Sequence, residues 1–162
     1  MNLCMAIMQD VHRQPNSRDC FVCGLESPVG LKLTFDDDGA GEVRCAYVIR
    51  PEYQGYPGIA HGGIVAAILD EVVGRVALIG DPNHFMMTVR MEITYRQPVP
   101  VDTPLTILGR PVRMGGRVTR AVGEVRLPDG SVAVEAALTL VDVPERMRAD
   151  GALDALGWKV YP

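Results

Sequence analysis

The sequence contains one long segment, residues 63–79, in which apolar side chains follow one another with few interruptions. Drawn as a helix, this segment is apolar on every face, and such a helix must be enclosed by protein. It also holds Asp70, Glu71 and Arg75, so it is too charged and too short to span a bilayer. The sequence therefore predicts a single buried helix that the rest of the chain must cover.

Strand-like runs lie on both sides of this helix. Leu31, Leu33 and Phe35 alternate with polar residues, which predicts a strand over 31–35, a turn over 36–39 and a pairing strand over 43–49. Past a turn at 80–83, four further runs follow, over 86–97, 105–112, 117–127 and 131–141. The Pro-Asp-Gly turn before the last run is a hairpin signal. The predicted fold class is α+β, with an antiparallel sheet wrapped around one helix.

Length and composition limit what the chain can be. At 162 residues without a repeat or a low-complexity linker, one domain over 1–162 is expected, with an N-terminal arm (1–19) and a C-terminal extension (143–162) holding a short surface helix over 144–156. The net charge of −4 argues against nucleic acid as a partner. Residues 1–10 lack the features of a signal peptide, so a cytoplasmic protein with reduced thiols and no membrane partner is expected.

The run His61-Gly62-Gly63 stands where a loop enters the predicted helix. The first N–H groups of a helix have no partner within it and carry the positive end of its dipole. Two glycines there let a ligand approach the backbone closely. Such an end suits an anion, or an oxygen that becomes negative in a transition state. Alternatively, the glycines only permit a tight junction between loop and helix.

Asp70 is unusual because a carboxylate in an apolar helix loses hydration unless it is paired or faces a site. Such residues often serve functional roles. The alternative is a structural ion pair with Arg75 or an acidic helix edge shared with Glu71. Since side chains four apart align better than those five apart, Glu71 and Arg75 form the expected structural pair. This assignment leaves Asp70 free for chemistry.

The spacing between the two features has a further consequence. Gly62 and Asp70 are eight residues apart, about 12 Å along an α-helix. One small carbonyl group cannot contact both on the same chain. If both act on one reaction centre, a second copy must supply one of them, which predicts a dimer with shared sites.

Several stretches resemble the hotdog-fold thioesterases of the phenylacetic-acid-pathway (PaaI-like) type and the related thioesterase superfamily members. The run from His61 to Asp70, HGGIVAAILD, is similar to their central helix, and CFVCG at 20–24 to the opening of the second branch. TVRMEITYRQPVP at 88–100 resembles their strand after the helix, and the Asp129-Gly130 hairpin fits as well. The resemblance covers roughly residues 20–142.

The resemblance implies an acyl-CoA thioesterase with a hotdog sheet around the helix, in which two subunits join their sheets as a homodimer or a dimer of dimers. The Gly62 N–H would polarise the thioester carbonyl. Asp70 of the partner subunit would activate water or attack the carbonyl, Thr88 would position that water or nucleophile, and His61 would shape the loop. No cofactor and no metal is implied.

Four further residues are candidates for substrate binding. Gly63 lies beside Gly62, and Arg113 and Arg117 could hold the phosphates of CoA, or they could simply be solvated. The wider family often carries an amide six residues before the histidine, where this chain has Gly55, and Gln54 is the neighbouring amide. The acyl group itself is not indicated.

The pair Cys20 and Cys23 has the spacing of a metal or redox motif, but a zinc site needs two more ligands, and no second half is recognisable. A structural role is the expectation. Two other functions remain open for the whole chain: a hotdog hydratase or dehydratase, and a non-catalytic acyl-CoA-binding module. The first would need a different acid–histidine motif, and the second would not need Asp70 and Thr88.

Overall fold

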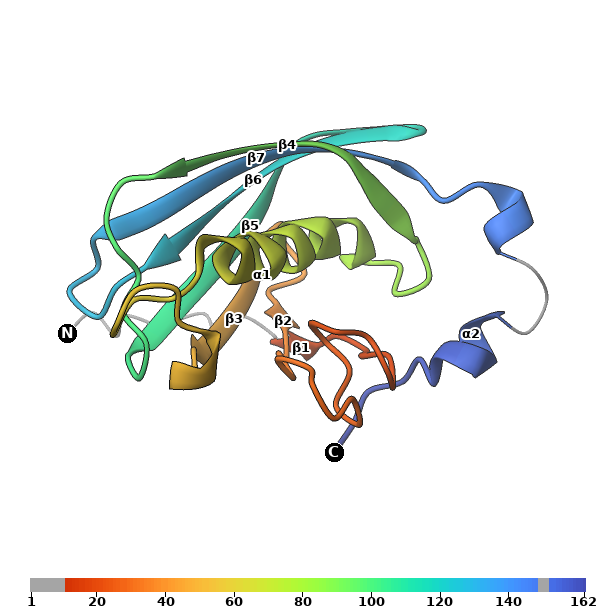
Figure 1. The fold of residues 1–162 in the computed structure, drawn as a ribbon. Coiled ribbons are helices and arrows are strands. Elements are labelled where there is room, and N and C mark those ends of the chain that lie inside the picture. Colours follow the sequence, from red (N-terminus) through yellow and green to blue (C-terminus); the bar gives the residue numbers. More distant parts are fainter. Residues whose placement is uncertain (1–10, 149–151) are drawn as a thin grey trace, which may run out of the picture.

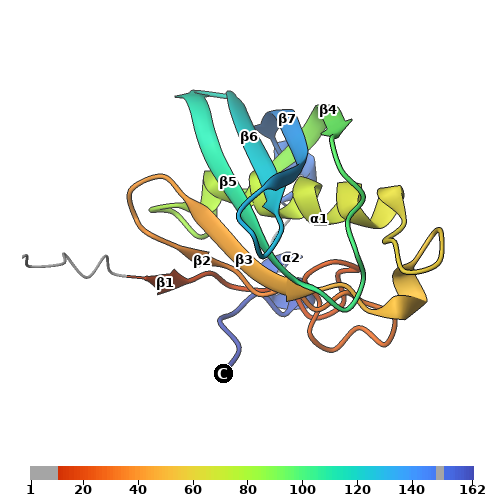
Figure 2. The same cartoon turned by 90° about the vertical axis from the view of Figure 1, so that its left-hand side faces the viewer.

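The computed structural model describes residues 11–148 and 152–162, and it contains one antiparallel sheet that curves around helix α1 (Gly62–Gly74) (Figure 1, Figure 2). This is the predicted α+β layout of a hotdog fold. The seven strands are β1 (His12–Arg13), β2 (Asp36–Asp37), β3 (Val43–Val48), β4 (Met86–Tyr95), β5 (Pro104–Gly115), β6 (Val118–Arg126) and β7 (Val132–Asp142). They lie in the order β1-β2-β3-β5-β6-β7-β4.

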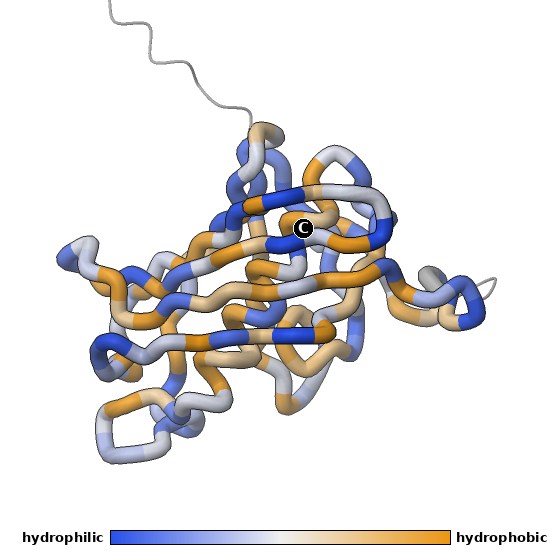
Figure 3. Tube along the Cα trace, turned by 90° about the horizontal axis from the view of Figure 1, so that it is seen from above, coloured by the Kyte–Doolittle hydropathy of each residue, from blue (hydrophilic) through white to orange (hydrophobic). Residues whose placement is uncertain are grey.

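The four strands after the helix lie where the sequence predicts them, to within about three residues at either end. Along β6, buried and exposed residues alternate for the first five positions. Figure 3, which looks onto the outer face of the sheet, shows hydrophilic and hydrophobic residues interspersed along the strands. One face of the sheet is therefore free for solvent while the other packs on α1.

The predicted strand over 31–35 is wrong. Leu31, Leu33 and Phe35 are buried, but residue 32 has a φ of 61°, and the Leu31 and Leu33 N–H groups donate to Phe21 and Val22 in a neighbouring loop. The alternation of apolar and polar residues over 31–35 thus reflects which side chains are buried, and it does not indicate strand pairing. Pairing begins instead at β2, within the predicted turn, and the turn to β3 is shifted toward residues 38–42.

Helix α1 packs unusually close to the sheet. Its buried side chains are Val65, Ile68, Leu69, Val72 and Val73. Two glycines face them from the sheet: a Cβ added at Gly109 would lie 2.8 Å from the Val72 carbonyl oxygen, and one at Gly123 would lie 2.3 Å from Val73 Cγ2. The sequence prediction of a helix over 63–79 is confirmed as α1 followed by a 3-10 turn, η2 (Arg75–Leu78).

The remaining short helices are η1 (Pro51–Tyr53), η3 (Glu145–Met147) and α2 (Ala152–Leu156). The single surface helix predicted over 144–156 is therefore two short helices, with residues 149–151 outside the described part. After α2 the chain returns toward its beginning, where Asn16 and Lys159 form a bridge. The expectations for residues 1–10 also fall outside the described residues. In the described ranges, each helix is too short to cross a membrane.

Candidate active site

His61 caps the start of α1 with its side chain. Its Nδ1 accepts the Gly63 N–H at 3.0 Å, and its carbonyl oxygen accepts the Ile64 and Val65 N–H groups. In residues 11–148 and 152–162, the N–H of Gly62 has no hydrogen-bond acceptor. The cap therefore engages the Gly63 amide in the first turn of α1 and leaves the Gly62 amide as the donor that a ligand can reach.

Tyr95, at the end of β4, contacts this helix start from the sheet. Its hydroxyl donates to the Gly62 carbonyl oxygen at 2.7 Å, and burial raises the pKa of Tyr95, which keeps the hydroxyl protonated. A hollow of about 300 Å³ opens here, lined by Ile59, Ala60, Gly62, Val65, Tyr95 and residues 96–99. Tyr95 is a site residue that the sequence does not reveal, since nothing local to residue 95 shows that it reaches a glycine 33 positions earlier.

Gln54 belongs to the loop that precedes the cap. Its side-chain oxygen accepts the N–H of Gly58 at 3.0 Å, and its backbone bridges to Ala60. Gly58 has a φ of 77°, a conformation that glycine adopts without strain. The Gln54 carbonyl oxygen thus closes the loop that presents His61.

Asp70 and Thr88 are brought together from α1 and β4. The Thr88 hydroxyl donates to Asp70 Oδ1 at 2.7 Å, and both residues are half-buried. The pairing of β4 with β7 shifts register between Thr88 and Arg90. A bulge of this kind bends a strand and re-aims its side chains, which explains how an edge strand turns a hydroxyl toward the helix.

This pair lies in a different hollow from Gly62. The second hollow has a volume of about 360 Å³ and also borders Cys20, Cys23, Glu71 and part of the 84–88 segment. Because α1 runs as a continuous helix from Gly62 to Gly74, the rise between Gly62 and Asp70 is about 12 Å. The two groups of one chain therefore face separate hollows.

Glu71 and Arg75 form the expected ion pair. The Arg75 Nε donates to Glu71 Oε1 at 3.0 Å, and Arg75 also donates to the Pro15 carbonyl oxygen at 2.6 Å. Burial raises the pKa of Glu71 to about 7, although the Arg75 charge acts in the opposite direction. With Arg75 engaged in this way, Asp70 is left to Thr88, as the helix spacing predicts.

Arg113 and Arg117 are exposed near the turn between β5 and β6. Neither residue lines the hollow at Gly62 or the hollow at Asp70. The structure therefore does not bring these two arginines to the other candidate residues within one chain.

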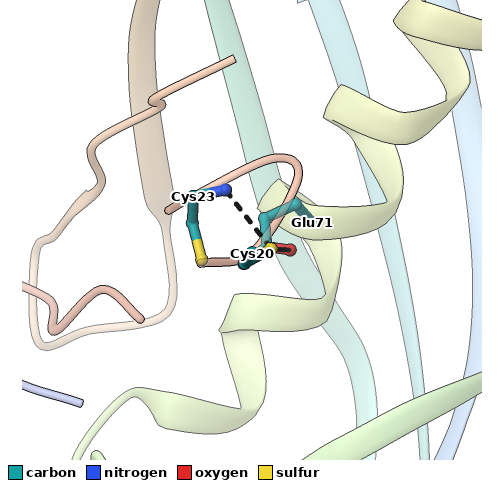
Figure 4. Close-up of side chains that lie close together, drawn as sticks. All are labelled: Cys20, Cys23 and Glu71. Carbon is teal, nitrogen blue, oxygen red and sulfur yellow. Dashed lines mark hydrogen bonds between the residues drawn. The ribbon is translucent and has the colours of Figure 1, made fainter. Parts of the chain in front are cut away.

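Cys20 and Cys23 lie against the middle of α1 (Figure 4). The Cys20 sulfur accepts the N–H groups of Val22 and Cys23 at 3.3 and 3.4 Å, and it lies 4.0 Å from Glu71 Oε2. The side-chain hydrogen bond between the two thiols lowers the pKa of Cys20 to about 6, while the same bond and burial raise the pKa of Cys23 to about 12. The sequence pattern did not indicate Glu71 as a neighbour of the two thiols.

Comparison with known proteins supports the fold and shows which proteins this chain is similar to. A family model described as thioesterase superfamily matches residues 57–134. The chain is 28% identical over 98 residues to acyl-coenzyme A thioesterase THEM4 of Bos taurus, which is 60% of this chain and 39% of the relative. The chain thus spans about two fifths of the length of the curated relatives it matches first.

Two solved structures are informative. A protein described as a thioesterase superfamily protein superposes with a TM-score of 0.69 at 32% identity, over 77% of this chain and 61% of that one. A Streptococcus mutans UA159 protein bound to acetyl CoA has the same fold, with a TM-score of 0.59 at 22% identity over 64% of this chain and 82% of that one. Both agree with a sheet wrapped around one central helix.

Proposed function

Because this chain has the hotdog fold of the thioesterase superfamily, we propose that it hydrolyses acyl-CoA thioesters to a free acid and CoA. The similarity to an acyl-coenzyme A thioesterase and to a protein bound to acetyl CoA supports this substrate class. The observation that carries the proposal is the half-buried Asp70 carboxylate, held by the Thr88 hydroxyl at the wall of a hollow.

The Gly62 amide is the electrophilic half of the proposed site. Gly62 is the first residue of α1, and its N–H is not engaged by a protein acceptor in the described residues. This N–H lies at the positive end of the helix dipole and is available to a ligand. A thioester carbonyl oxygen gains negative charge as water attacks, and a fixed N–H stabilises that charge. The His61 cap and the Tyr95 hydroxyl hold the Gly62 peptide in place, so the donor needs no rearrangement.

The Asp70 carboxylate is the nucleophilic half. It takes a proton from water, whose oxygen attacks the thioester carbon, or it attacks that carbon itself and is then released by water. In both routes the carbon–sulfur bond breaks, a carbon–oxygen bond forms, and the CoA sulfur leaves as a thiol. Thr88 donates to Oδ1 and so fixes which way the second carboxylate oxygen points.

The two halves of a site come from different copies of the chain in this proposal. In one chain Gly62 and Asp70 face separate hollows, about 12 Å apart along α1. In a two-fold dimer, a contact from one chain to the other is repeated in the opposite direction. Gly62 of each chain can therefore meet the Asp70 carboxylate of the other chain, and the dimer then holds two equivalent sites. We place the join along the sheet edges, as a homodimer or as a dimer of dimers.

The CoA part of the substrate is assigned to exposed groups. Arg113 and Arg117 carry the positive charge that phosphates need, and neither is part of an ion pair in the described residues. Gly63 and Gln54 shape the entrance to the Gly62 hollow, since the first is held by His61 and the second closes the preceding loop.

A thiol-release assay over short, long and aromatic acyl-CoAs tests the proposal, with wild type and Asp70→Asn compared. Wild type should release thiol from at least one class, and the variant should lose most of that rate while still binding the substrate. Binding without thiol release by the wild type would instead identify an acyl-CoA-binding module. Equal rates for both proteins would remove Asp70 from the mechanism.

A further inference from the structure

Three potential metal-ligating groups meet beside the candidate active site. The sulfur atoms of Cys20 and Cys23 and a carboxylate oxygen of Glu71 all lie within 4.8 Å of one another. The cysteines come from a turn near the start of the chain and Glu71 comes from α1, with the Cys20 sulfur and the Glu71 carboxylate adjacent (Figure 4). We propose that these three residues form a Zn²⁺ site whose fourth position is open to the hollow that Asp70 borders. This proposal does not depend on the thioesterase activity.

The turn that carries the cysteines is shaped to hold a thiolate. The Cys20 sulfur accepts backbone N–H groups from Val22 and Cys23, and the Gly24 N–H donates to the Cys20 carbonyl oxygen at 2.9 Å. A Cβ at Gly24 would lie 2.3 Å from that oxygen, so only glycine allows the turn to close this tightly. Two cysteines separated by two residues is the spacing of zinc-binding turns.

Glu71 is oriented by a partner of its own. Arg75 donates to Glu71 Oε1, which leaves Oε2 directed toward Cys20 at 4.0 Å. Arg75 is itself fixed by the Pro15 carbonyl oxygen and by the Phe35 ring, whose centroid lies 3.8 Å from the guanidinium carbon. A ligand held by such an outer contact is preorganised for a metal.

Charge and size both suit a divalent zinc ion. Two thiolates balance the two positive charges of Zn²⁺ once their protons pass to solvent, and Arg75 balances the Glu71 carboxylate. The buried cluster then carries no net charge, which limits the cost of burial. Zinc binds sulfur at about 2.3 Å and carboxylate oxygen at about 2.0–2.2 Å. If the three ligand atoms move slightly closer together, they can occupy three of the four tetrahedral positions around the ion.

The fourth position is the reason to regard the site as more than a structural cross-link. The hollow lined by Cys20, Cys23 and Glu71 is the same one that Asp70 and Thr88 border. Three protein ligands with one water-filled position is the arrangement of open zinc sites. A bound ion would join the 20–24 turn to α1 at the residue that follows Asp70 in the sequence.

Cobalt binding to the reduced, chelator-treated protein provides the test. Thiols are counted first to establish that Cys20 and Cys23 are not joined by a disulfide. Co²⁺ is then titrated, and we expect one equivalent to produce the near-ultraviolet absorption of sulfur-to-cobalt charge transfer, which added Zn²⁺ abolishes. Absence of this absorption in reduced wild type overturns the proposal and leaves the pair a structural or redox element.

Variants show whether these three residues are the ligands. Cys23→Ser should lower the charge-transfer intensity by about half and weaken Co²⁺ binding at least about tenfold, while Glu71→Gln should keep the intensity per bound ion and also weaken binding. Cys45→Ala is the matched control, because this buried cysteine of β3 lies outside the cluster and should bind as wild type does. Retention of the absorption by a Cys20→Ser, Cys23→Ser double variant, or its loss in the control, contradicts the assignment. The wild-type titration carries the test even if one variant fails to fold.

Discussion

The Thr88 hydroxyl donates to Asp70 Oδ1 at 2.7 Å and so joins strand β4 to the middle of the central helix. Thr88 stands beside a register shift of its strand, and Asp70 is one of two carboxylates, with Glu71, on a helix whose other residues are apolar. Each is a local irregularity in its own element, and the two irregularities meet. This contact is the point from which the proposed chemistry can be tested most directly.

Replacing Thr88 by valine removes the hydroxyl while keeping the branched shape of the side chain. A hydrogen bond to a charged group contributes about 1.5–3 kcal/mol, so we expect kcat to fall at least about tenfold with little change in KM. Thr88→Ser is the control, because it retains the donor and should keep most of the activity. A valine variant as fast as wild type would show that the contact has no role in turnover.

Mixing two inactive variants tests the shared site. Gly62→Pro removes the proposed N–H donor where proline is tolerated, at the first helical residue, and His61 already has the extended backbone that precedes proline. When equal amounts of the Gly62→Pro and Asp70→Asn variants are refolded together, about half of the dimers contain one chain of each. Each mixed dimer holds one intact site. We expect about a quarter of the wild-type rate, whereas each variant alone stays inactive. No recovery in dimers verified as mixed would mean that each site belongs to one chain.

Arg113 and Arg117 are expected to act on binding and not on chemistry. The double variant Arg113→Ala, Arg117→Ala should raise KM for acyl-CoA several-fold, leave kcat near wild type and reduce the dependence of KM on salt. Arg44→Ala on β3 is the control, since this exposed arginine already pairs with Glu42. A KM shift of equal size in the control would assign the effect to overall charge.

The contact between α1 and the sheet should not tolerate a methyl group at Gly123. A Cβ there would meet Val73 Cγ2 and lie 2.7 Å from the Leu108 carbonyl oxygen, so Gly123→Ala should destabilise the fold by about 1–3 kcal/mol. Gly115→Ala, next to the turn of the same hairpin, should have little effect because its nearest neighbour is 3.9 Å away. Thermal unfolding of both variants provides the comparison.

Asp38 holds the turn between β2 and β3 in a pH-dependent way. Burial alone would raise the pKa of its carboxyl, but the N–H groups of Ala40, Gly41 and Glu42, each 2.9 Å from Oδ1, lower it below its ordinary 3.8. Because the folded-state pKa is depressed, the stabilisation exists above the unfolded value and is lost as pH falls through the folded value. Asp38→Ala should cost less than about 1 kcal/mol at pH 7, since the turn is partly exposed, and the gap to wild type should close in acid. A gap that stays constant in unfolding measurements at pH 7 and pH 3 would contradict this role.

Local pattern determined much of this protein. The all-round apolar run at 63–79 required an enclosing sheet, and four-residue spacing paired Glu71 with Arg75 and left Asp70 unpaired. The glycines at the helix start pointed to an available amide. These predictions succeed because helix periodicity, helix ends and hairpin turns are set by residues only a few positions apart.

Tertiary structure alone decided the features that depend on distant segments. The alternation at 31–35 looks like a strand, yet its hydrogen bonds go to a loop, because burial and pairing are separate requirements that give the same pattern. Tyr95 reaches Gly62 across 33 residues, and Cys20 reaches Glu71 across 51. No local period encodes such contacts, since they arise only when the sheet closes over the helix and brings the start of the chain against its middle.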